Sequence, residues 1–264
     1  MNLIESYQEI DEENRLQSTL ARRVEYLTTI NVLNTYCHKS KNCIDVGCGV
    51  GIYALYLDKF GIKTTAIDLV PDHINRLKEL IAQSNANIEA CVGNVLDLSA
   101  YQSNSYDMVL CLGPLYHLLT SAEQDKCIIE CKRLAKSGGV LLFSYISPYS
   151  VFPCAVRGNM ERMSLELIEK IVNDHKIEAD SPYCFWTDNY YHDPIEIETL
   201  LSRHNLEIVD HLATDGQSVA FQNMVNQMTE NQFLLWIKYH FKTCRIRSML
   251  GASNHGLVVT RKKV

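Results

Sequence analysis

Five short apolar runs are interleaved with amphipathic helical segments between residues 42 and 146 of this 264-residue chain. This alternation is typical of a parallel sheet, because each crossover helix returns the chain to the same end of the next strand. Right-handed crossovers place such helices on both faces. We therefore predict an α/β fold with a doubly wound, mostly parallel, Rossmann-like sheet. The expected strands span residues 42–47, 63–69, 87–93, 105–113 and 140–146, and the expected helices span 51–61, 71–84 and 121–139.

The segments on either side of this core follow other patterns. Apolar residues at helical spacing predict one long helix over 10–38. Residues 148–192 contain three prolines and an aromatic cluster, and we interpret them as a cap over the carboxyl edge of the sheet. A helix, a strand over 206–213, a helical region over 217–250 and a last strand over 255–262 are expected to complete the fold.

Charge and hydropathy exclude several classes of protein. The net charge is −6 and no long run of one sign occurs, so a nucleic-acid partner is not expected. No apolar run is long enough to span a bilayer, and the acidic, polar start resembles no signal peptide. We expect a cytoplasmic protein without a membrane partner. The sequence does not indicate an oligomeric state.

Ten cysteines occur without a CxxC pair or a zinc-like spacing. Cys127 and Cys131 are four residues apart in a predicted helix and should share one face. Several others lie in apolar runs, where a free thiol behaves as a small hydrophobic group. We predict free thiols and no metal site.

Three alternate glycines follow the first predicted strand. Gly47, Gly49 and Gly51 follow Asp45 after one intervening valine. Glycine allows a close approach of the backbone to a ligand, and ligands of open α/β sheets bind beyond the carboxyl ends of the strands. We therefore predict a turn that contacts a nucleoside-bearing cofactor, with a tight turn without ligand as the alternative.

Asp68 ends the second predicted strand and could accept both hydroxyls of an adenosine ribose. Its alternative role is to cap the helix that begins near Pro71. Gly49, Gly51 and Ala54 also satisfy the relaxed dinucleotide fingerprint GxGxxA, so these residues alone leave an NAD-type cofactor open.

The order of five motifs resembles class I S-adenosylmethionine-dependent methyltransferases. The motifs are IDVGCGVG (44–51), AIDL (66–69), GNVLDL (93–98), YDMVLCLGPLYHL (106–118) and RLAKSGGVLLF (133–143). The last strand, HGLVVTRK (255–262), resembles the antiparallel seventh strand of that fold, inserted between strands five and six. The LGPLYHL stretch resembles a small bacterial subgroup of these enzymes.

The resemblance implies S-adenosyl-L-methionine as the cofactor and assigns its contacts. The glycine loop would face the methionine and ribose, Asp68 the ribose, residues 69, 94 and 95 the adenine, and residues 112–114 the sulfonium. The family often has Asp where this chain has Asn94, whose carbonyl can still accept a hydrogen bond. The implied cofactor-binding residues are Asp45, Gly47, Cys48, Gly49, Gly51, Asp68, Leu69, Asn94, Val95, Leu112, Gly113 and Pro114.

The resemblance also implies a single methyltransferase domain over 1–264. It would comprise an N-terminal helical arm (1–38), a cofactor-binding core (39–147), a cap insertion (148–192) and the C-terminal part of the sheet (193–264).

A base is needed only if the methyl acceptor must lose a proton. His117 follows the fourth strand and is the first candidate catalytic residue, and His192 in the cap is the second. Each has a structural role as its alternative.

We expect methyl transfer to a small-molecule acceptor by in-line displacement in a capped pocket. The alternatives are an RNA or protein methyltransferase, an NAD-dependent oxidoreductase, and a binding protein without turnover. The oxidoreductase would need a Tyr-x-x-x-Lys motif, which the residues after the fifth strand do not supply.

Overall fold

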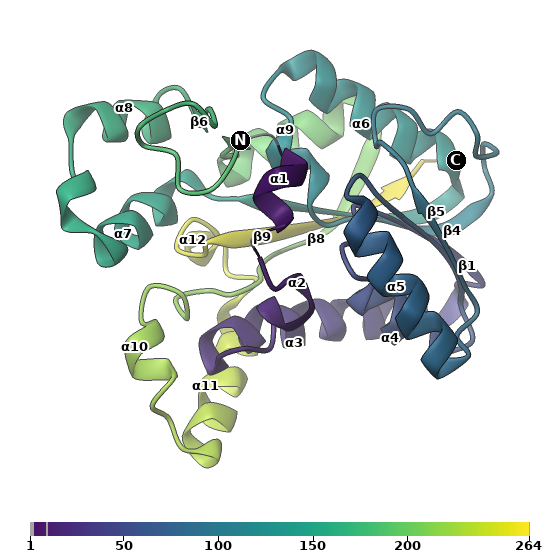
Figure 1. The fold of residues 1–264 in the computed structure, drawn as a ribbon, viewed down its shortest axis with the longest axis horizontal. Coiled ribbons are helices and arrows are strands. Elements are labelled where there is room, and N and C mark those ends of the chain that lie inside the picture. The colour runs from purple at the N-terminus through teal and green to yellow at the C-terminus, as the bar shows by residue number, and fades with distance from the viewer. Residues whose placement is uncertain (1–2, 9, 264) are drawn as a thin grey trace.

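The computed structural model describes residues 3–8 and 10–263. Its main sheet has seven strands in the order β3-β2-β1-β4-β5-β9-β8 (Figure 1). Neighbouring strands from β3 to β5 pair in parallel, and β9 is antiparallel to both β5 and β8. The predicted fold class and the insertion of the last strand are confirmed. The strands are β1 (Asn42–Val46), β2 (Lys63–Asp68), β3 (Ile88–Val92), β4 (Tyr106–Cys111), β5 (Ala135–Ile146), β8 (Leu206–Ala213) and β9 (His255–Lys262).

Helices cover both faces of this sheet (Figure 1). On one face α6 (Ser121–Leu134) and α9 (Pro194–Arg203) pack against the sheet. On the other face lie α3 (Leu20–Tyr36), α4 (Ile52–Asp58) and α5 (Pro71–Ser84). The burial of apolar side chains on both faces explains why the strand sequences are continuous apolar runs.

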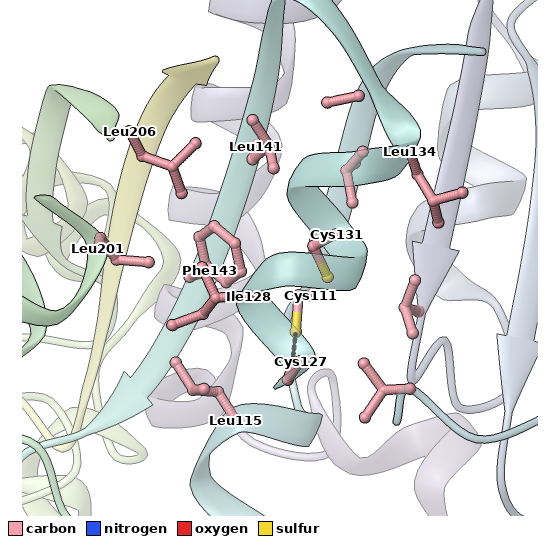
Figure 2. Packing of buried hydrophobic residues seen from close by; sticks show 14 of the residues in the cluster. Cys111, Leu115, Cys127, Ile128, Cys131, Leu134, Leu141, Phe143, Leu201 and Leu206 are labelled. Atoms are coloured by element: carbon pink, nitrogen blue, oxygen red, sulfur yellow. Dashed lines mark hydrogen bonds between the residues drawn. The ribbon is translucent and has the colours of Figure 1, made fainter. Parts of the chain in front are cut away.

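Cysteines contribute to the core between α6 and the sheet. Cys127 and Cys131 share the buried face of α6, as their spacing predicts, and Cys111 of β4 lies against them (Figure 2). The sulfur atoms of Cys111 and Cys127 are 3.7 Å apart. Because leucine, isoleucine and phenylalanine side chains surround these thiols, we interpret them as core packing.

The predicted helix over 10–38 is wrong. The chain instead forms α1 (Leu3–Gln8), α2 (Glu12–Arg15) and α3, which begins only at Leu20. The hydroxyl of Thr19 accepts a hydrogen bond from the backbone N–H of Arg22 at 3.3 Å and so caps α3. A threonine N-cap stabilises a helix start and separates it from the turn before it.

Two other boundaries also differ from the prediction. Helix α6 ends at Leu134 rather than at 139, because the chain becomes extended at Ala135, where β5 begins. The helical region over 217–250 consists of three separate helices. They are α10 (Gln222–Val225), α11 (Glu230–Thr243) and α12 (Arg247–Leu250).

The segment 148–192 forms a small unit beside the carboxyl edge of the sheet (Figure 1). It contains α7 (Pro148–Gly158), α8 (Leu165–Val172) and a two-stranded sheet of β6 (Lys176–Ile177) and β7 (Asn189–Tyr190). A separate apolar cluster holds this cap together. Among the described residues, no helix has the length and apolar character needed to cross a membrane.

The turn after β1 uses glycine for two physical reasons. Gly47, Gly49 and Gly51 all have left-handed backbone, with φ of 73°, 55° and 78°. A Cβ on Gly47 would also lie 2.5 Å from Pro114, and one on Gly51 would lie 2.4 Å from Leu77. Packing of the protein itself therefore excludes side chains at two of the three positions.

The substitution Gly51→Ala should destabilise the fold more than Gly61→Ala. Gly61 also has a left-handed backbone, but a Cβ there would meet no atom within 4 Å. Backbone strain should cost each variant about 1–2 kcal/mol. The collision with Leu77 should add roughly 1–3 kcal/mol to the Gly51 variant alone. Urea unfolding measures the difference, and equal losses would contradict this packing.

Candidate functional site

Two cavities lie at the carboxyl edge of the parallel strands. The strand-end cavity has a volume of about 110 Å³, and its polar lining comes from the ends of β1 to β4. The capped cavity has a volume of about 390 Å³ and lies between the sheet, the arm and the cap. Tyr7 of α1 lines both, so the two cavities adjoin there. The strand-end cavity is lined by Leu3, Tyr7, Gly47, Asp68, Leu69, Val70, Gly93, Asn94, Val95, Gly113, Pro114, His117 and Leu118.

Asp68 connects the two turns beside the strand-end cavity. Its carboxylate accepts hydrogen bonds from the backbone N–H of Gly49 at 2.7 Å and of Val70 at 2.9 Å. The ring of His73 lies 3.2 Å from the same carboxylate. The N-cap of α5 is Val70 rather than Asp68. Because a carboxylate has about four acceptor positions, Asp68 can still accept a ligand hydroxyl.

The far side of this cavity combines apolar surface with a carbonyl group. Leu69 and Val95 supply the apolar surface, and Asn94 lies next to them. The side-chain oxygen of Asn94 accepts a hydrogen bond from the backbone N–H of Leu96 at 2.9 Å, so part of its role is to form this turn. Its second lone pair remains available to a ligand amino group.

Seven of the twelve predicted cofactor residues line the strand-end cavity, and five do not. The five lie behind its wall or in the glycine turn, and they are Asp45, Cys48, Gly49, Gly51 and Leu112. Gly49 faces the arm, since a Cβ there would lie 3.3 Å from the side chain of Glu12.

Asp45 is a buried acid with an unsatisfied oxygen. Its Oδ2 atom has no hydrogen-bond partner among the described residues. Burial and the nearby charge of Asp68 raise the pKa of Asp45 to about 7. A buried acid without a full set of partners beside a ligand turn is a reason to expect a further polar group there.

His117 connects the arm to the cap. A carbonyl can only accept, so Nδ1 donates to the carbonyl of Asp188 at 2.9 Å. The other nitrogen, Nε2, then accepts from the hydroxyl of Tyr7 at 3.1 Å. Burial lowers the pKa of His117 to about 4. Both nitrogens are engaged, and a catalytic role for His117 stays a prediction.

His192 is fully buried and lines neither cavity. Its Nε2 lies 3.4 Å from the side-chain oxygen of Gln124, and burial lowers its pKa to about 4. A catalytic role for His192 also stays a prediction, and this position gives it no direct contact with either cavity.

The capped cavity combines aromatic residues of the cluster noted in the cap sequence with residues that the sequence did not single out. Cap aromatics serve both as wall and as core, since Phe185 and Tyr191 line the cavity and also belong to the apolar cluster of the cap. Arg15, Arg22 and His255 add cations to the lining. No local sequence motif identifies Arg15, Arg22 and His255 as cavity residues, because their positions depend on contacts between segments far apart in the chain.

Comparisons with known proteins find methyltransferases. Residues 44–143 match a family model described as a methyltransferase domain. Over these residues the chain is similar to the class I S-adenosylmethionine-dependent methyltransferases. A ubiquinone biosynthesis O-methyltransferase of Xanthomonas oryzae pv. oryzae is 34% identical over 104 residues, which cover 39% of this chain and 42% of that protein. This chain therefore spans less than half the length of that curated methyltransferase.

Solved structures show the same methyltransferase fold. A protein of Pyrococcus horikoshii OT3 has a TM-score of 0.64 at 15% identity, over 98% of this chain and 99% of that one. A SAM-dependent methyltransferase of Methanosarcina mazei has a TM-score of 0.59 at 18% identity, over 88% and 97%. The [4+2]-cyclase SpnF has a TM-score of 0.57 at 16% identity, over 91% and 81%. The fold of this methyltransferase family therefore does not by itself fix the reaction.

S-adenosylmethionine is the cofactor of this family, and the chemical groups that line the strand-end cavity suit its nucleoside. The cavity offers a carboxylate for a ribose, a carbonyl oxygen for an amino group and apolar surface for a flat ring. Asp45 lies behind the same turn, and its buried oxygen does not line the cavity.

His117 should make the protein less stable in acid. Unfolded histidine takes up a proton near its ordinary pKa of 6.5, whereas burial holds the folded group at about 4. At pH values between these two pKa values, the unfolded state therefore binds more protons than the folded state. The free energy of unfolding then falls as the pH falls from 6.5 to 4. His117→Gln should reduce this fall by about 1–3 kcal/mol. Urea unfolding from pH 7 to 4.5 checks this, with exposed His38→Gln as the control, and parallel curves would contradict it.

Proposed function

We propose that this protein transfers a methyl group from S-adenosylmethionine to a small molecule held in the capped cavity. The observation that carries this proposal is the pair of adjoining cavities with different linings. The strand-end cavity has polar groups suited to a nucleoside, and the capped cavity has the apolar and aromatic wall typical of small-molecule sites.

In this proposal Asp68 binds the ribose, and Asn94 and Val95 bind the edge of the adenine. Leu69 packs along the adenine ring. Pro114, which lines the strand-end cavity and packs on the glycine turn, fixes the position of the reacting end. These roles follow from the cavity lining together with the family pattern.

The cofactor supplies an already activated methyl group, so the protein acts mainly by positioning. Tyr7 and the cap aromatic Trp186 enclose the acceptor side. The indole N–H of Trp186 donates to the carbonyl of Ser6 at 3.0 Å, and the rings of Tyr7 and Trp186 meet edge to face at 4.5 Å. This contact joins the arm to the cap and limits the access of water to the site.

Several observations support a small acceptor over RNA or protein. The net charge is −6, and aromatic side chains of the cap line the capped cavity. The matched Xanthomonas protein is named for O-methylation in ubiquinone biosynthesis, which concerns a small molecule. The alternative is a protein that keeps the cofactor site without methyl transfer.

Binding of S-adenosylhomocysteine and NAD in parallel tests the cofactor assignment. Isothermal titration should show binding of S-adenosylhomocysteine and none of NAD. To test transfer, the protein is incubated with S-adenosyl-[methyl-¹⁴C]methionine and fractionated cell extract. We expect label in a small-molecule product that separates by chromatography from unreacted S-adenosylmethionine. Label in the RNA or protein fraction, or no transfer despite binding, would contradict the proposal.

Asp68→Asn should weaken the binding of S-adenosylhomocysteine by about 10- to 100-fold. The variant loses a charged acceptor, and hydrogen bonds to charged groups are worth roughly 1.5–3 kcal/mol each. Asp180→Asn changes the net charge equally at an exposed position of the cap segment and should stay within about twofold, since no contact is lost. Titration calorimetry measures both, and thermal unfolding confirms that both fold. Unchanged affinity in Asp68→Asn would contradict the ribose assignment.

A further inference from the structure

The capped cavity has an uneven distribution of charge. Three cations line it, namely Arg15, Arg22 and His255. No aspartate or glutamate is among the described residues that line it. The remaining wall is mostly apolar or aromatic, with Phe185 and Trp186 from the cap and Tyr116 from the sheet edge.

The acids that balance two of these cations lie outside the cavity lining. Arg15 donates to the carboxylate of Glu12 at 2.8 Å. The carboxylate of Glu25 lies 4.0 Å from Arg15 and 3.4 Å from Nδ1 of His255, through the same oxygen. Glu25 therefore connects Arg15 and His255 and holds them close together at one wall.

His255 is also fixed from behind by Asp215. Nδ1 of His255 lies 3.0 Å from the fully buried carboxylate of Asp215. That carboxylate also accepts hydrogen bonds from the hydroxyl of Ser253 at 2.6 Å and from the backbone N–H of Asn254 at 2.8 Å. Asp215 has its acceptor positions occupied, which argues against a metal ion between Glu25, Asp215 and His255.

The second ring nitrogen of His255 has no hydrogen-bond partner among the described residues. Burial alone would lower the pKa of His255, but Glu25 and Asp215 outweigh it and raise the pKa above its ordinary value. When the ring carries a proton on both nitrogens, it presents a donor on the side away from its acids, at the cavity that the ring lines.

Arg22 is the third cation and has no ion pair with any acid in the part of the chain that the structure describes. It projects from α3, and its guanidinium donates only to the backbone carbonyl of Arg15, at 3.5 Å. Its neighbour Arg23 lies instead over the ring of Phe233, 5.7 Å from the centroid. An arginine beside an apolar cavity is suited to a planar carboxylate, because its fork of N–H groups matches the two oxygens.

We propose that the capped cavity binds an aromatic carboxylic acid, with its carboxylate on the cations that Arg22, His255 and Arg15 present and its ring against the cap aromatics. This assignment rests on the proposed function, because it names the class of methyl acceptor. The carboxylate orients the acceptor, and the aromatic wall holds its apolar body.

Matched pairs of acids and neutral amides test this assignment by titration calorimetry. The full chain, saturated with S-adenosylhomocysteine, is titrated with phenylacetate, 3-phenylpropionate and 2-naphthylacetate and with their amides. We expect an acid to bind about tenfold more tightly than its amide in at least one pair, because charged hydrogen bonds are stronger than neutral ones. Equal affinities in every pair, or no measurable binding of any acid, would overturn the proposal.

Variants identify the cations that carry this preference. Arg22→Gln should lose about tenfold in affinity for the acid and leave the amide unchanged, since it removes a charged donor pair. Arg22→Lys should regain part of the loss. Arg23→Gln is the matched control on the next residue and should bind as the unsubstituted protein does. His255→Gln should also lose acid affinity, and thermal unfolding shows whether it folds. A preference that survives both Arg22→Gln and His255→Gln would overturn the proposal.

The cofactor titration separates this proposal from the proposed function. An acid preference without binding of S-adenosylhomocysteine would reject the methyltransferase assignment and keep the carboxylate site. Binding of S-adenosylhomocysteine without an acid preference would reject the carboxylate site and keep the methyltransferase assignment.

Discussion

The geometry of the site depends on the carboxylate of Asp68. It joins the glycine turn after β1 to the start of α5 through hydrogen bonds to the backbone of Gly49 and Val70. The same turn also bonds to β2 directly, because Gly47 and Cys48 both donate to the carbonyl of Ile67. These contacts hold two adjacent strand ends in one rigid edge. The strand-end cavity owes its shape to this edge, and the ring of Tyr7 lies between it and the capped cavity.

The arm and the cap complete the site because neither cavity is enclosed by the sheet alone. Figure 1 shows α1 lying between the cap and α5. Tyr7 contacts both, since its ring lies 4.5 Å from that of Trp186 and 5.1 Å from that of His73. His117 accepts a hydrogen bond from the hydroxyl of Tyr7 and donates one to the carbonyl of Asp188 in the cap. In this structure His117 therefore joins three segments, and a role in positioning the arm accounts for all of its contacts.

Much of the fold could be predicted from the sequence, because local patterns determine it. The last strand has the predicted bounds, and α5 begins at Pro71 and ends at Ser84 as expected. The break before α3 could not be read from apolar spacing, since it depends on the capping hydroxyl of Thr19.

The site residues also divide into those that local motifs predict and those that only the folded chain brings together. Asp68 ends β2 and Asn94 comes shortly after β3, so both could be found from their motifs. The cation His255 could not, because its partners Glu25 and Asp215 come from distant segments that meet only in the folded chain. Arg22 carries no motif at all, and its significance depends on the cavity that it lines.

The central claim is that the edge held by Asp68 binds the nucleoside and directs the reacting end toward the capped cavity. A crystal structure with S-adenosylhomocysteine tests it most directly. The account predicts the ribose on Asp68, the adenine between Leu69 and Asn94, and the thioether sulfur beside Pro114 and open to the capped cavity. A ligand bound elsewhere, or one whose sulfur faces away from the capped cavity, would contradict it.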